Sequence, residues 1–290
     1  MAGIFGLFDY TKEGPGIPKD APPKPRFVIF FEVLGRKFWK IIRVNLMFGL
    51  FNIPAILFLL LFSAYYLQLI IPPETLFKEE MDVLGYLWGA AVPLLSVFVC
   101  LPMITVGPAQ AGMTYILRNF SREEHAFLWS DFIEHAKKNF KQGMIVGAIN
   151  LFITVLVLLD IYIYLKLPGN FLITAASTMI SVAFVVFMMM SMYIYPMMVT
   201  FKLTIRQLYK NAVLFAIMKF IPNLLILILC LAIVIVPFYF SPAIGYVLFI
   251  SITMALICFI TNFYVYPNIN KYMIKPTLEK GEEEQVPAQD

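Results

Sequence analysis

The sequence predicts an all-α integral membrane protein with six transmembrane helices, and three observations support this fold class. Hydrophobic residues make up 61% of the 290 residues and charged residues only 14%, whereas soluble domains carry about 25% charged residues. The apolar residues lie in runs long enough to cross a bilayer core, which takes about 20 helical residues. Runs such as residues 224–229 (LLILIL) are apolar on every side, which favours helices over the alternating pattern of a membrane β-barrel.

The predicted spans are six apolar stretches, each bounded by charged residues, proline or glycine: residues 44–71, 84–106, 142–165, 171–201, 220–240 and 243–267. With their connections they form a membrane domain over residues 27–275. The preceding residues 1–26 are rich in proline and lack the basic start and apolar core of a signal peptide, so we expect a flexible cytoplasmic arm. Residues 276–290 are expected to form an acidic, flexible tail.

The lysines and arginines predict the orientation of the spans. Residues 12–43 hold eight of them, residues 118–141 five, residues 202–219 four and residues 271–280 three, so that 20 of the 22 lie on one face of the membrane. Cytoplasmic loops are enriched in Lys and Arg. We therefore expect this face, and both chain termini, in the cytoplasm.

A basic segment precedes each pair of spans: residues 35–40 (GRKFWK), 135–141 (HAKKNFK) and 206–211 (RQLYKN). Each pair also ends at a proline, at positions 102, 196 and 267. The pattern predicts three tandem helical hairpins with amphipathic cytoplasmic lead-in helices. The alternative is that basic inner loops and terminal prolines are common to six-span proteins in general.

The middle lead-in helix has an expected apolar face, made of Trp129, Phe132, Ile133, Ala136 and Phe140. Amphipathic helices of this kind lie in the membrane interface or dock onto a partner. The basic residues of the lead-in segments, among them Lys138, Arg206 and Lys210, are therefore candidate partner contacts.

Residues 84–120 are nearly all apolar, and a straight helix over them would be about 55 Å long, too long for one span. Gly107 and Pro108, together with the proline at 102, predict a break. Proline suits the first turn of a helix, so a new helix is expected over residues 109–120, leaving the membrane or lying along its inner face.

The start of this new helix is a candidate ligand site, because free backbone N–H groups at a helix N-terminus favour anions and broken membrane helices mark transport sites. Its candidate residues are Thr105, Gly107, Pro108 and, at the far end, Arg118. The alternative is a kinked span without a ligand.

Several of these segments resemble the YesL family of bacterial inner-membrane proteins: residues 101–109 (LPMITVGPA), 115–118 (YILR), 129–132 (WSDF), 138–141 (KNFK) and 204–212 (TIRQLYKNA). The N-terminal Gly-Leu-Phe is similar as well, whereas the Pro-rich arm and the Glu-rich tail depart from the family. The resemblance covers most of the chain. It implies a multi-pass inner-membrane protein whose gene lies near carbohydrate-uptake genes, commonly beside sugar ABC permeases. The family has no established activity and no catalytic residues, so the resemblance implies a context and not a mechanism.

Polar residues inside the spans are few and are therefore candidate functional residues. Asp160 lies inside an apolar run near two tyrosines, which indicates either an acid at the outer membrane interface or a contact for a cation or sugar hydroxyl. Asn150, like Asn52, Asn223 and Asn262, is explained by hydrogen bonds between helices or by a ligand.

No enzymatic or metal-binding pattern is present in the sequence. His125 and His135 lack the spacing of metal ligands and are interpreted as part of a solvated helix face. The three cysteines are interpreted as small buried residues. We therefore expect no catalytic residues, no cofactor, no metal and no nucleic-acid partner.

The sequence is consistent with two candidate functions. The first is an accessory membrane protein of carbohydrate uptake, acting through contact with a sugar ABC permease or a sensor kinase. The second is a self-sufficient transporter or channel for a small sugar-like or neutral solute.

Overall fold

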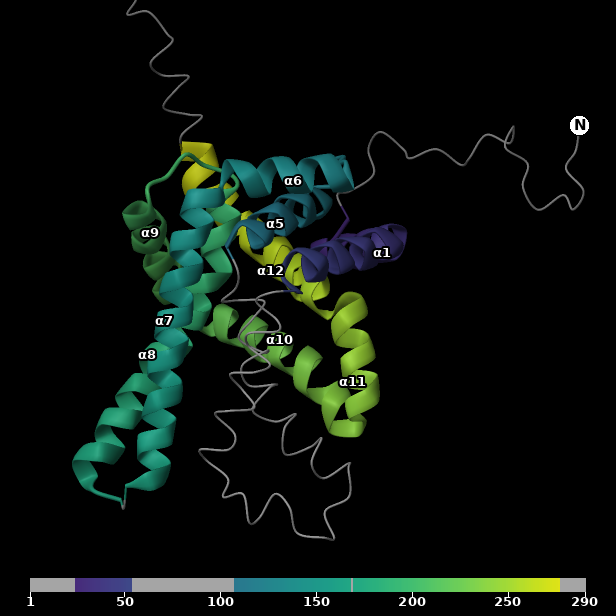
Figure 1. The fold of residues 1–290 in the computed structure, drawn as a ribbon. Coiled ribbons are helices and arrows are strands. Elements are labelled where there is room, and N and C mark those ends of the chain that lie inside the picture. Colours follow the sequence, from purple (N-terminus) through teal and green to yellow (C-terminus); the bar gives the residue numbers. More distant parts are fainter. Residues whose placement is uncertain (1–23, 54–106, 168, 277–290) are drawn as a thin grey trace, which may run out of the picture.

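The computed structural model describes residues 24–53, 107–167 and 169–276, and all regular structure in this part of the chain is helical (Figure 1). The helices are α1 (Arg26–Phe51), α5 (Gly107–Ser121), α6 (Leu128–Lys138), α7 (Phe140–Lys166), α8 (Phe171–Met198), α9 (Ile205–Met218), α10 (Phe220–Phe240), α11 (Pro242–Leu248) and α12 (Met254–Ile269), with π-helical turns η1 (Phe249–Thr253) and η2 (Asn270–Ile274).

Among the described residues, four helical segments are long and apolar enough to cross a membrane: Phe140–Lys166, Phe171–Met198, Phe220–Phe240 and Ala243–Ile274. The chain is therefore an all-α protein with membrane-type helices, and the last four predicted spans coincide with these segments. The count of six stays a prediction, because residues 54–71 of the first predicted span and all of the second lie outside the described residues. Nearly all of the predicted arm and tail lie outside them too.

The predicted lead-in helices α6 and α9 directly precede the long helices α7 and α10. Thr204 caps α9 through a capping box with Gln207, the pattern that satisfies the free N–H groups of a helix start. The first lead-in differs from the prediction, because α1 continues without a break across the expected boundary at residue 43.

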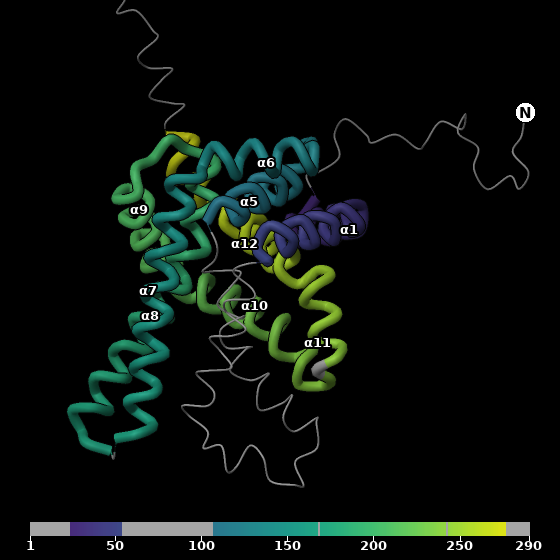
Figure 2. Tube along the Cα trace, in the orientation of Figure 1, coloured from purple at the N-terminus to yellow at the C-terminus, as the bar shows by residue number. Residues whose placement is uncertain are grey.

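The predicted break before Pro108 is present, since α5 begins at Gly107. The position of this helix, outside the membrane or along the inner face of the membrane, stays a prediction. Most residues of α5 are buried, and the helix contacts α1, α6, α7, α8 and α12. Figures 1 and 2 show α5 between α6 and α12, with α1 beside it. A helix with small and apolar residues on all sides, such as Ala109, Ala111 and Met113, is suited to this central place.

Two close helix crossings depend on glycine. A Cβ atom on Gly112 of α5 would lie 2.5 Å from the backbone oxygen of Phe132 in α6. A Cβ atom on Gly143 of α7 would lie 2.7 Å from the backbone carbon of Gly107, whose positive φ of 42° also favours glycine. These two crossings bring α6 and α7 directly against the backbone of α5.

The two Tyr-x-Tyr-Pro motifs at the ends of the hairpins meet at one asparagine. Tyr193 of α8 and Tyr264 of α12 each donate a 2.7 Å hydrogen bond to Oδ1 of Asn223 in α10. Nδ2 of Asn223 donates to the carbonyl oxygens of Phe215 and Ala216 in α9. Hydrogen bonding between helices by Asn223 is therefore present, and it joins the second and third predicted repeats.

Asn45 of α1 binds the π-helical turn η1 in the last long helix. Its Nδ2 donates to the carbonyl oxygens of Phe249 and Ile250 at 3.3 and 2.7 Å, and its Oδ1 accepts from the backbone N–H of Ala255 at 2.8 Å. A π turn holds one more residue than an α turn and displaces backbone groups from the regular ladder. The buried Asn45 amide satisfies these displaced groups.

The outer halves of α7 and α8 form a hairpin that extends away from the rest of the bundle (Figure 2). Its surface exposes large apolar side chains, such as Leu165 and Phe171, as expected for a surface that faces lipid. Asp160 of α7 accepts a 3.0 Å hydrogen bond from the hydroxyl of Ser177 in α8, which joins the two helices near their outer ends.

Candidate functional site

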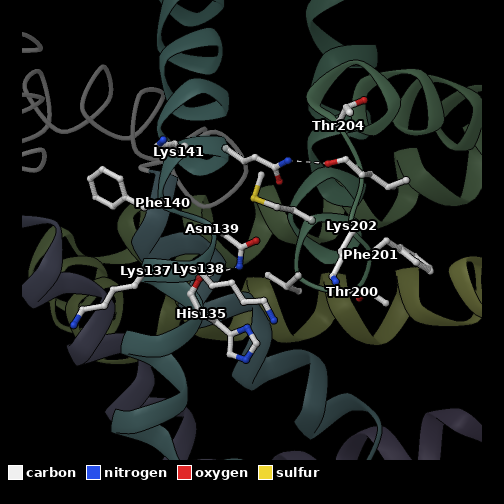
Figure 3. Close-up of a pocket in the computed structure, with 14 residues that line it drawn as sticks. His135, Lys137, Lys138, Asn139, Phe140, Lys141, Thr200, Phe201, Lys202 and Thr204 are labelled. Carbon is white, nitrogen blue, oxygen red and sulfur yellow. Dashed lines mark hydrogen bonds between the residues drawn. The ribbon is translucent and has the colours of Figure 1, made fainter.

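A basic groove of about 790 Å³ lies where α6 meets α7 and where α8 leads into α9 (Figure 3). One wall consists of residues 135 and 137–142 and the other of residues 198–204. These segments are the ends of α7 and α8 opposite the loop that joins the two helices. The groove therefore lies at the end of two candidate membrane spans, and its volume is that of a small-molecule site.

Hydrogen bonds to the backbone hold the two walls together. Gln142 Nε2 donates to the carbonyl oxygen of Leu203 at 2.8 Å, directly across the groove. Arg118 of α5 donates from Nη1 to the carbonyl oxygen of Val199 at 2.8 Å and to the Thr200 hydroxyl at 3.1 Å. The α8–α9 wall is thus fixed from both sides.

Four exposed lysines line the groove: Lys137, Lys138, Lys141 and Lys202. None of the lining residues is an aspartate or glutamate, and none of the four lysines takes part in an ion pair with another described residue. Figure 3 shows Lys138 and Lys202 extending from opposite walls toward the space between them. The groove therefore carries a net positive charge that no acidic side chain within it offsets.

His135 lies on the buried side of the groove and is only 9% exposed. Its ring stacks on Tyr115 with 3.3 Å between ring centroids, and its Nδ1 has no hydrogen-bond partner among the described residues. Burial lowers the pKa of His135 from its usual 6.5, so the ring is neutral at pH 7 and offers one N–H donor and one acceptor.

Arg118 lies beneath the same groove, with its guanidinium 4.6 Å from the centre of the Tyr115 ring. Burial, followed by the nearby charge of Arg122, lowers the pKa of Arg118 to about 10. The guanidinium therefore stays charged at neutral pH and adds to the positive potential of the groove.

A second, much smaller cavity of about 20 Å³ lies between α5, α8 and α12. Neutral polar side chains line it, including Thr114, Ser191, Thr261 and Asn262. Oδ1 of Asn262 has no hydrogen-bond partner among the described residues. A cavity of this size and polarity is suited to one water molecule.

Of the candidate site predicted at the start of α5, the structure describes Gly107 and Pro108. Gly107 is buried, packs against the Gly143 backbone, and its backbone is hydrogen-bonded to the Tyr195 hydroxyl. Pro108 lies in the first helical turn and is half-buried. Thr105 lies outside the described residues.

The other candidate residues are spread over the molecule. Lys138 lines the groove and Arg118 supports its wall, whereas Arg206 and Lys210 are exposed on α9 and do not line it. Asp160 lies near the far ends of α7 and α8. Asn150 of α7 is fully buried, and neither of its side-chain polar atoms has a partner among the described residues.

Sequence reasoning missed His135 as part of a site, because it placed this residue on a solvated helix face. That interpretation is wrong: α6 turns Phe132 and His135 toward α5, and leaves Trp129 and Phe140 of the expected apolar face exposed. The spacing of Leu128, Phe132 and His135 is a helical period as well, and it is the signal that was available.

The comparison with protein families gives one match. A family profile described as "Protein of unknown function, DUF624" matches residues 41–161. The matched segment contains α5, α6 and the lysine-rich wall of the groove, and ends before the α8–α9 wall. No curated protein and no solved structure gives a significant match to the chain.

Proposed function

We propose that this chain is an accessory protein of the bacterial inner membrane, similar to the YesL family, which acts by contact with a membrane partner of carbohydrate uptake. The partner is a sugar ABC permease or a sensor kinase. The chain lies with both termini in the cytoplasm, as its lysines and arginines predict, and carries out no catalysis of its own.

The observation that carries this proposal is the exposure of large aromatic residues on helical segments that lie outside the six predicted spans. Trp39 on α1 is 72% exposed and Trp129 on α6 is 56% exposed. Tryptophan is enriched in the energetically dominant positions of protein interfaces. Exposed basic residues such as Lys40 and Arg43 accompany the α1 aromatics, which suits a partner with acidic cytoplasmic loops.

Affinity purification of the full chain from a bacterial membrane in mild detergent tests the proposal, with partners identified by mass spectrometry. A sugar permease or a sensor kinase should accompany the wild-type chain and be lost from the double variant Trp39→Ala/Trp129→Ala. The matched control is Phe152→Ala/Phe171→Ala, which removes two exposed aromatics from the candidate spans and should keep the partner. Recovery of neither class of partner with the wild-type chain refutes the proposal.

The second candidate function is transport of a small neutral solute, and the neutral polar side chains that lie between α5, α8 and α12 favour it. Polar groups inside a bundle of membrane helices are costly and frequently mark a solute path. Purified protein in liposomes should then take up one member of a panel of labelled sugars, and Thr114→Val should reduce the rate. No uptake of any sugar above that of empty liposomes excludes this function.

A further inference from the structure

We infer that the basic groove is a binding site for a phosphate group, presented either by an anionic lipid headgroup or by a soluble phosphorylated compound. The inference concerns a different surface from the exposed tryptophans and does not depend on the partner proposed above.

The charge of the groove points to an anion. Lys138 and Lys202 extend from opposite walls toward the space between them (Figure 3), and Lys137 and Lys141 raise the potential around it. Glu134, the acidic residue nearest to this wall in sequence, lies on α6 outside the lining residues. Cations that gather without acidic partners repel one another, and an anion placed between them removes that repulsion.

His135 adds a polar group at the buried edge of the groove. This residue is more than nine-tenths buried, lines the groove, and leaves Nδ1 without a partner among the described residues. A buried polar atom without a hydrogen bond costs free energy. Nδ1 is itself buried, so it reaches a phosphate oxygen only when the His135 ring shifts toward the groove, out of its stack on Tyr115.

The shape and place of the groove narrow the class of anion. A volume of about 790 Å³ is much larger than one inorganic phosphate ion needs, so the phosphate belongs to a larger molecule. Phe140, Met198, Phe201 and Leu203 give the groove an apolar part beside the lysines. The lining residues lie at the ends of two candidate spans, where lipid headgroups are found. Basic pockets between membrane helices at this depth bind anionic headgroups, and a sugar phosphate offers the same phosphate chemistry.

Two binding experiments on the full chain in dodecyl maltoside distinguish the two sources. Native mass spectrometry measures binding of phosphatidylglycerol against phosphatidylcholine, which has a phosphate but no net charge. Isothermal titration calorimetry measures binding of glucose 6-phosphate and of inorganic phosphate. Saturable binding in the first experiment assigns the phosphate to a lipid, and saturable binding in the second assigns it to a soluble compound.

The variants decide whether the groove is the site. Lys138→Gln/Lys202→Gln should weaken binding at least tenfold in whichever experiment shows it. The control Arg206→Gln/Lys210→Gln removes the same charge from the exposed face of α9, outside the groove, and should change affinity less than twofold. His135→Phe keeps the stacked ring and removes the donor, and should weaken binding several-fold at pH 7.

Three results overturn the inference: no saturable binding in either experiment, equal loss of binding in the two double variants, or phosphatidylcholine binding as tightly as phosphatidylglycerol with no soluble phosphate bound. Unchanged affinity of His135→Phe removes this residue from the site. Size-exclusion chromatography and circular dichroism check that each variant is folded. We expect the lysine variants to fold, because the substituted lysines are exposed.

Discussion

Substitution of Gly112 tests the packing that places α6, and with it one wall of the groove. In Gly112→Ala, the new Cβ would lie 2.5 Å from the backbone oxygen of Phe132 and 3.2 Å from its Cγ. Carbon contacts are most favourable at about 3.5–4.0 Å, so α6 must move away by about 1 Å. Since the closest atom belongs to the backbone, no side-chain rotation relieves the contact.

Gly35→Ala is the matched control, because Gly35 lies inside α1 and its added Cβ would meet nothing within 4 Å. Both variants gain the same helix propensity, about 1 kcal/mol. They should therefore differ by the cost of overpacking alone, about 1–3 kcal/mol, with Gly112→Ala the less stable.

The assay is unfolding of the full chain by SDS titration from dodecyl maltoside, followed by far-ultraviolet circular dichroism. Gly35→Ala should be about 1 kcal/mol more stable than the wild type, and Gly112→Ala should be about 1–3 kcal/mol less stable than Gly35→Ala. Equal stability of the two variants would refute the close crossing of α5 and α6.

The same unfolding assay checks three further expectations. Asn223→Leu should destabilise the fold by about 1–3 kcal/mol for each tyrosine hydroxyl left without an acceptor, most of it from Tyr193, which is fully buried; a loss below 0.5 kcal/mol would contradict the shared contact. Asn45→Leu should cost at least as much, because the backbone groups displaced in η1 lose their partners, and wild-type stability would show that water satisfies them. Burial depresses the pKa of His135 below its usual 6.5, so the unfolded chain binds this proton more readily. The contribution of the neutral ring to stability is therefore complete above pH 6.5 and is lost as the pH falls through the lower folded pKa. His135→Phe should reduce the dependence of stability on pH below pH 6.5, and an unchanged dependence would assign it to other groups.

The hydrophobic pattern predicted the long helices well, because a membrane span is defined by its own length and composition. Residues 142–165, 171–201 and 220–240 match α7, α8 and α10 closely. The start of α5 was predictable for a similar reason, since Pro108 fixes the local backbone whatever surrounds it.

Features that depend on distant parts of the chain were not predictable in this way. The buried face of α6 is the one that packs on α5 and includes Phe132 and His135. Helical periodicity alone was also consistent with burial of Trp129 and Phe140, which are exposed. The groove joins walls that are 61 residues apart at the Gln142–Leu203 contact. Only the lysine-rich wall was visible as a motif in the sequence, whereas Lys202 lines the groove from the other wall.

The π turn η1 also determines the direction in which the side chains after it point around the helix axis. One extra residue in a helix rotates each later side chain by about 100° around the axis, since an α-helix has 3.6 residues per turn. Cys258 and Asn262 come after this turn, and Cys258 faces Thr114 of α5. Their direction is therefore tied to a residue more than 200 positions earlier, because Asn45 holds the turn open. Helix α1 thus determines which face of α12 points to the interior. In a chain that lost α1, α12 could turn a different face inward.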